Sequence, residues 1–126
     1  MKKNIFLFLS ISLGTLSMVA QEKQDSIKFD KTMHDFKTLS QGGDGTCQFT
    51  FVNEGDNPII LSNVRSSCGC TVPKWPRKPI QPGESGVIDV KYNTNRIGRF
   101  NKSITVSSNA VNSPVVLRIM GTVEAK

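Results

Sequence analysis

Residues 47–52 read Cys-Gln-Phe-Thr-Phe-Val, a stretch in which apolar and polar side chains alternate one by one. Successive side chains of an extended chain point to opposite faces, so Cys47, Phe49 and Phe51 share one face. Such alternation is typical of a β-strand that buries one side. We therefore expect these three residues to be structural, with Cys47 packed in the core as a small apolar side chain.

The same alternation recurs along most of the chain after residue 26. The inward-facing residues predicted within 87–92, 100–107 and 115–123 are Ile88, Val90, Tyr92, Phe100, Ile104, Val106, Val115, Leu117, Ile119 and Val123. Turn-forming residues cluster at 53–58, 81–84 and 108–109 and separate these stretches. No window shows a sustained helical period. The sequence predicts an all-β protein, an immunoglobulin-like antiparallel β-sandwich of about seven strands.

Two connecting segments have a distinctive composition. Residues 71–82 contain four prolines, which cannot donate continuously to a sheet ladder, so we expect this segment to cross the rim from one sheet to the other. Residues 41–45 read Gln-Gly-Gly-Asp-Gly, and we expect a hairpin loop there. A phosphate-binding loop would lead into a helix, and none is predicted after it.

The first twenty residues have the features of a secretory signal peptide. Lys2 and Lys3 give a positive start, an apolar run follows to Leu16, and small or neutral residues lead to Ala20. The run is short for a membrane-spanning helix, which needs about 20 apolar residues, and we expect no transmembrane span in the mature form. We expect residues 1–20 to be removed and residues 21–126 to form a single domain, exported to the periplasm or outside the cell.

The charge balance is mildly basic. The formal net charge of +6 becomes +4 once Lys2 and Lys3 are removed, which bears on solubility more than on the choice of partner. Lysine and arginine are scattered along the chain and do not form a stripe on one element, so a nucleic-acid partner is not expected.

Several short motifs occur at residues 53–55 (Asn-Glu-Gly) with Pro58, 67–71 (Ser-Cys-Gly-Cys-Thr), 79–83 (Pro-Ile-Gln-Pro-Gly), 98–100 (Gly-Arg-Phe), 104–106 (Ile-Thr-Val) with Ser108 and Asn109, and Gly121. Together they resemble a bacterial family of unknown function, domain family 1573. The resemblance covers about residues 29–123 and implies an exported immunoglobulin-like domain, similar in fold to ASH and major sperm protein domains. It implies no agreed activity. One departure is visible, because the family's early Asp-Phe-Gly stands here as Asp-Phe-Lys at residues 35–37.

Three cysteines in an exported chain leave at least one outside an internal disulfide. A bond from Cys47 to Cys68 or Cys70 is possible but not favoured. If the strands that flank the turn near residue 56 run side by side, Cys47 lies level with about residue 64. At ~3.3 Å per residue, Cys68 is then on the order of 10 Å away, whereas a disulfide needs Cα atoms within about 7 Å.

Cys68 and Cys70 are the candidate redox or metal-binding pair. Residues i and i+2 of a strand face the same side, with Cα atoms about 6–7 Å apart, and Gly69 can take φ values that bring the sulfurs together. A closed bond would form a small strained ring of the labile kind. Two thiolates would instead suit Cu(I) or Zn(II), although two ligands do not fill a tetrahedral site and the lone His34 is far off in sequence. A structural role at the rim is the third alternative.

The same region supplies a candidate interaction rim, made of Arg65, Lys74, Trp75, Arg77 and Lys78. Aromatic and cationic side chains concentrate at interfaces, although for Trp75 itself we prefer a role as a cover over the open end of the core. The first hypothesis is an exported, non-catalytic module that binds a protein or another envelope component through this rim or a sheet edge. The alternative is a thiol-redox or copper- or zinc-handling protein that uses Cys68 and Cys70. No cofactor is otherwise expected.

Overall fold

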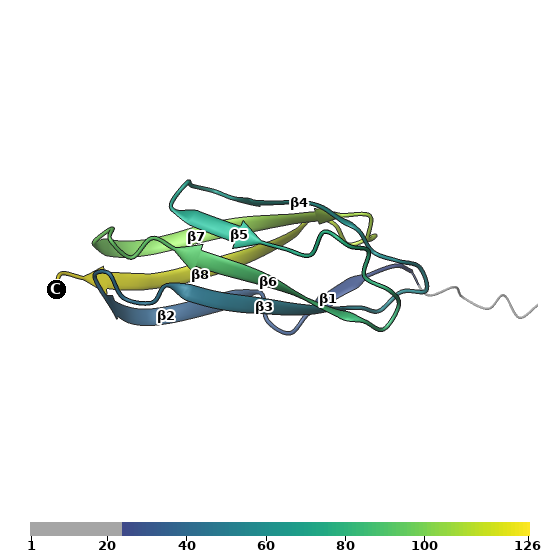
Figure 1. Cartoon of the computed structure of the whole chain (residues 1–126), viewed down its shortest axis with the longest axis horizontal. Coiled ribbons are helices and arrows are strands. Elements are labelled where there is room, and N and C mark those ends of the chain that lie inside the picture. The colour runs from purple at the N-terminus through teal and green to yellow at the C-terminus, as the bar shows by residue number, and fades with distance from the viewer. Residues whose placement is uncertain (1–23) are drawn as a thin grey trace, which may run out of the picture.

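Eight strands form two four-stranded sheets within residues 24–126, the part of the chain that the computed structural model describes (Figure 1). The first sheet has the order β1 (Ile27–Phe29), β3 (Thr46–Asn53), β6 (Ser85–Tyr92) and β5 (Thr71–Lys74). The second sheet has the order β2 (Met33–Ser40), β8 (Val115–Glu124), β7 (Gly98–Ser108) and β4 (Leu61–Ser66). The predicted signal peptide lies outside the described residues. No helix in the described part is long and apolar enough to cross a membrane.

The core lies between the two sheets and is built from the alternating residues of their inner faces. Phe49 and Phe51 are fully buried, as are Ile88 and Val90 on β6 and Ile104 on β7. Burying a side chain of this size contributes roughly 1.5–3 kcal/mol. The predicted immunoglobulin-like sandwich is therefore confirmed, and alternation identified most of the inward-facing residues correctly.

The first two strands of the chain, β1 and β2, belong to different sheets. β1 pairs antiparallel with β3, whereas β2 pairs parallel with β8, so the expectation of purely antiparallel pairing is not met here. The pairing of β2 is interrupted by a bulge between Asp35 and Thr38. Lys37 lies in this bulge with a φ of 61°, a left-handed conformation that costs most residues about 1–2 kcal/mol and glycine much less. This conformation gives a physical reason for the glycine that the resembled family carries at this position.

Two predicted connections are corrected by the topology. Residues 41–45 link β2 to β3, which belong to different sheets, so they do not form a hairpin loop. β3 and β4 likewise lie in different sheets, and the side-by-side pairing used to compare Cys47 with Cys68 does not occur. Local alternation specifies which face of a strand is buried, and it carries no information about which strand pairs with it.

The crossing between sheets also lies earlier than predicted. β4 ends at Ser66 in the second sheet, and β5 begins at Thr71 in the first. Residues 67–70 therefore make the crossing, and the proline-containing segment that follows begins with an ordinary edge strand. Pro73 is accommodated there because β5 is the end strand of its sheet and one of its edges needs no hydrogen-bond donor.

Candidate functional site

The crossing between β4 and β5 contains the Cys68–Cys70 pair, and the two sulfurs are joined in a disulfide. The Cα atoms of the two residues are 5.3 Å apart, within the range that a disulfide spans. Cys68 is half-buried and Gly69 is exposed, whereas Cys70 is only 5% exposed and belongs to the core. The disulfide thus joins a partly accessible cysteine, Cys68, to a cysteine that is buried in the core, Cys70.

Hydrogen bonds hold the backbone of this turn independently of the disulfide. The Ser66 hydroxyl donates to the carbonyl oxygens of Cys68 and Thr71, with 2.8 Å to the latter. The Asn93 amide donates to the Cys70 carbonyl oxygen at 2.8 Å. The Ser67 amide donates to the Ser103 carbonyl oxygen at 2.8 Å. These contacts tie the turn to β7 and to the segment after β6, so its position does not depend on the sulfur–sulfur bond alone.

Gly69 does not act as the sequence suggested. Its φ is outside the left-handed region, and a Cβ added there would meet nothing within 4 Å. The turn therefore does not need the conformational freedom of glycine, and the absence of a side chain instead leaves open space beside the disulfide. Thr71 supplies a hydroxyl on the protein side, with its Oγ1 at 4.0 Å from Cys68 Sγ and 3.9 Å from Cys70 Sγ.

Trp75 and Arg77 follow β5. Trp75 is half-buried and packs against the core, and the guanidinium of Arg77 lies 3.7 Å from the centre of the indole ring. A cation over an aromatic face is stabilised by about 0.5–1 kcal/mol at an exposed site. Within the described residues the Trp75 Nε1 atom is buried without a hydrogen-bond partner. The indole thus serves mainly as a cover for the core, and the exposed part of this pair is the Arg77 guanidinium.

Cys47 is a free thiol, 9% exposed, on the inner face of β3. Burial raises its pKa to about 11, and the nearby charge of Lys31 opposes that shift only in part. Since the thiolate is the reactive form of cysteine, Cys47 is a poor nucleophile at neutral pH. It also lies apart from the disulfide, which leaves Cys68 and Cys70 as the chemically distinctive pair.

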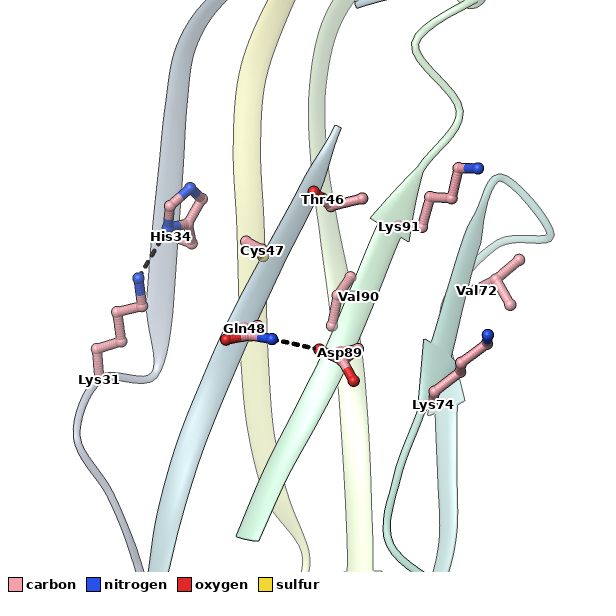
Figure 2. Close-up of a pocket in the computed structure, with 10 residues that line it drawn as sticks. All are labelled: Lys31, His34, Thr46, Cys47, Gln48, Val72, Lys74, Asp89, Val90 and Lys91. Atoms are coloured by element: carbon pink, nitrogen blue, oxygen red, sulfur yellow. Dashed lines mark hydrogen bonds between the residues drawn. The ribbon is translucent and has the colours of Figure 1, made fainter. Parts of the chain in front are cut away.

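Cys47 borders a groove of about 860 Å³ that runs over the first sheet (Figure 2). On one side Lys31 Nζ is 2.9 Å from His34 Nδ1, and burial together with the charge of Lys31 lowers the pKa of His34. On the other side β6 and β5 contribute Lys91 and Lys74. Gln48 Nε2 donates to Asp89 Oδ1 at 2.8 Å across the floor, as Figure 2 shows.

The charges of the molecule are segregated across the width of the sandwich. Residues 24–56, which contain β1 to β3, carry six carboxylates and three lysines. Residues 57–123, which contain β4 to β7 and nearly all of β8, carry nine lysines and arginines and only two carboxylates, Glu84 and Asp89. No single strand bears a stripe of cations, which is why they look scattered in the sequence. Counting each sign separately before and after residue 56 would have revealed the segregation.

The predicted rim residues lie on the cationic side. β4 and β5 are the end strands of their sheets on this side, and both lie at the upper edge in Figure 1. Arg65 is exposed on β4 and Lys74 on β5, with Arg77 and Lys78 exposed just beyond. The two ion pairs found within the described residues are Lys28 with Glu54 and Lys37 with Asp35. The rim cations therefore form no ion pair within the described part of the molecule, and the carboxylate that faces one of them is Asp89, opposite Lys74 in the pairing of β5 with β6.

A family model described as "Protein of unknown function (DUF1573)" matches residues 27–123, which is nearly the whole sandwich. The chain belongs to the DUF1573 family. A comparison of this DUF1573 chain with curated proteins finds no match.

Three solved structures similar to this DUF1573 domain are distant from it in sequence. A protein of unknown function from Porphyromonas gingivalis W83 aligns with a TM-score of 0.69 at 14% identity, over 86% of this chain and 51% of its own length. The seventh PapD-like (ASH) domain of human CEP192 gives a TM-score of 0.68 at 7% identity, over 82% and 88%. The CsuC–CsuE chaperone–adhesion subunit complex of Csu pili from Acinetobacter baumannii gives 0.58 at 9%, over 79% and 57%.

At such low identities these likenesses show the fold alone. The DUF1573 chain spans about half of the length of the Porphyromonas gingivalis protein. The likenesses confirm the resemblance to ASH and related sandwich domains.

Proposed function

We propose that this protein is an exported, non-catalytic binding module of the cell envelope that holds an acidic, extended segment of a partner protein along the β4 edge. The observation that carries the proposal is the coincidence of an end strand with a cationic border. The DUF1573 fold and its likeness to a pilus chaperone complex support a protein-binding role in general terms.

β4 is chosen by comparing the length, proline content and regularity of the four end strands. An end strand carries unpaired N–H and C=O groups that a partner strand can join. β1 has only three residues, β5 contains Pro73, and β2 is broken by the bulge that contains Lys37. β4 contains no proline, and although its register shifts between Leu61 and Asn63, its pairing with β7 is regular over the four residues from Asn63 to Ser66. It is therefore the best of the four edges for strand addition.

The charge of the rim specifies the chemistry of the segment. Arg65 lies on β4, Lys74 is the last residue of β5, and Arg77 and Lys78 follow it, all of them exposed. Complementary charges across an interface accelerate association and exclude partners of the wrong sign. A segment in which Asp or Glu alternates with apolar residues would pair its backbone with β4 and place its carboxylates beside these cations.

The test uses the mature protein and a random-peptide display library. We expect the selected peptides to be rich in Asp and Glu, and we expect their binding to perturb the amide NMR signals of β4. In the double variant Arg65→Glu/Lys74→Glu, each substitution loses an attraction to the acidic peptide of roughly 0.5 kcal/mol and adds a repulsion of roughly the same size. The sum of about 2 kcal/mol corresponds to about thirtyfold weaker binding at low salt.

A matched control carries the same change of net charge elsewhere. Arg96 and Arg99 are exposed near the start of β7, so Arg96→Glu/Arg99→Glu should leave peptide binding within about twofold, as expected for screened charges more than a Debye length of about 10 Å away. Selection of no acidic peptide, or equal losses in both double variants, would overturn the proposal. Binding to phosphatidylglycerol vesicles without peptide binding would also overturn it, in favour of a lipid partner.

A further inference from the structure

We propose that the Cys68–Cys70 disulfide is an exchange site that accepts two electrons from the dithiol of an exported partner protein, with Cys68 Sγ as the atom attacked. This activity rests on the crossing between β4 and β5 and is independent of the peptide-binding proposal. Three features of the crossing carry it: the partial exposure of Cys68, the small ring that the bond closes, and the hydrogen bonds that hold the turn.

The two sulfurs differ in access. Cys68 is half-buried and its neighbour Gly69 is exposed with open space where a side chain would lie, whereas Cys70 is 5% exposed. A thiolate attacks a disulfide along the sulfur–sulfur axis and forms a mixed disulfide with the sulfur that it reaches. An approach from solvent therefore reaches Cys68, and Cys70 becomes the leaving group.

Both sulfurs have polar neighbours, because the Cys70 amide donates to Cys68 Sγ at 3.3 Å and the Thr71 hydroxyl lies about equally far from each sulfur. The choice of the attacked sulfur therefore rests on access, and Thr71 is available to whichever sulfur leaves. Thr71 Oγ1 lies 3.9 Å from Cys70 Sγ, a distance at which the hydroxyl can donate a weak hydrogen bond to a sulfur that gains negative charge. A more stable leaving thiolate makes exchange faster. Thr71 is itself 3% exposed, so its hydroxyl has little competing contact with water.

The ring is too small for the bond to restrain much chain. Cys68 and Cys70 are two positions apart, so the bond closes a loop of three residues, and the stabilisation by a disulfide falls as its loop shortens. The turn is also held by the bonds from Ser66 and Asn93 described above. A structural staple would instead be placed across a long loop, and disulfides in small strained rings are the labile ones.

The reaction is balanced as follows. One thiolate of the partner attacks Cys68 Sγ, the sulfur–sulfur bond breaks, and Cys70 leaves as a thiolate that takes up a proton. The second thiol of the partner loses its proton and attacks the mixed disulfide at the partner's own sulfur, which releases Cys68 as a thiolate that is then protonated. The partner dithiol is oxidised to a disulfide, and Cys68–Cys70 is reduced to two thiols.

The experiment begins with the native mature protein and dithiothreitol as the probe dithiol, without denaturant. After alkylation with iodoacetamide, we expect Cys68 to be modified first, because it is the half-buried member of the pair, whereas Cys70 and Cys47 are 5% and 9% exposed. Cys47 serves as an internal control, because it is largely buried and burial raises its pKa to about 11, so its thiol reacts slowly while the sandwich stays folded. A disulfide that stays closed until denaturant is added would refute the proposal, as would alkylation of Cys47 at the same rate as Cys68.

Single-cysteine variants test which sulfur is attacked. In Cys70→Ala the Cys68 thiol should form a mixed disulfide with oxidised glutathione at least tenfold faster than the Cys70 thiol does in Cys68→Ala. Equal rates would overturn the assignment of Cys68. If either variant fails to fold, the order in which Cys68 and Cys70 of the reduced wild-type protein react with limiting iodoacetamide gives the same comparison. Faster labelling of Cys70 would overturn the assignment.

Discussion

Reduction of the Cys68–Cys70 bond is expected to lower the free energy of unfolding by only about 1.6 kcal/mol at 25 °C. The bond joins residues two positions apart, and the chain-entropy relation gives that value for a closed loop of about three residues, against about 3 kcal/mol for about fifteen. With an unfolding entropy of about 2.1 cal/mol/K per residue, the melting temperature of a domain of roughly 100 residues should fall by about 7 °C.

The assay is thermal unfolding at pH 7, followed by circular dichroism, of the native protein with and without a phosphine reductant. The double variant Cys68→Ala/Cys70→Ala, melted without reductant, provides a second measurement of the same loss. A fall in stability of about 4 kcal/mol or more, comparable with removal of a typical structural disulfide, would refute the reasoning. It would mean that the bond stabilises the rim well beyond the loop that it closes.

Two further predictions concern backbone positions of the sandwich. Gly86→Ala should lower the free energy of unfolding by about 2 kcal/mol in chemical denaturation, because the added methyl group would overlap the buried Phe51 ring and overpack the core. In the matched control Gly69→Ala the methyl group meets open space, and the free energy of unfolding should change by less than about 0.5 kcal/mol. Equal effects of the two substitutions would contradict the packing around Gly86. Lys37→Gly should raise stability by about 0.5–1 kcal/mol, since glycine relieves the left-handed strain at a small entropic cost; a loss of stability in the same assay would show that the bulge carries no strain.

The sequence was sufficient to predict the buried face of each strand and insufficient to predict its neighbours. Alternation placed Phe49, Ile88 and Leu117 in the core because the side-chain period of a strand is two whatever strand it pairs with. The parallel pairing of β2 with β8 joins residues about 85 positions apart, and no local pattern encodes that separation. The mistaken hairpin at residues 41–45 has the same cause, since glycine-rich turns serve both hairpins and crossings between sheets.

The candidate site shows the same division between local and long-range information. Ser-Cys-Gly-Cys-Thr is a local motif, and the proximity of Cys68 to Cys70 followed from their spacing alone. The roles of Ser66 and Asn93 did not, because Asn93 reaches the turn only through the pairing of β5 with β6. The cationic border was equally hidden, since Arg65 and Lys74 are seen to share one side of the sandwich only when β4 and β5 are known to be end strands of different sheets.

The hydrogen bonds of the turn support the proposal that Cys68 and Cys70 take part in thiol exchange more than they stabilise the fold. Ser67 is bonded to Ser103 through both its amide and its hydroxyl, and the carbonyls of Cys68 and Cys70 accept hydrogen bonds from Ser66 and Asn93. These contacts use backbone groups and serine side chains, so any small residues at positions 68 and 70 would allow them. The sulfur–sulfur bond adds only the entropy of a three-residue ring, about 1.6 kcal/mol. What the bond alone supplies is an electrophilic sulfur on the half-buried Cys68, in the crossing between β4 and β5.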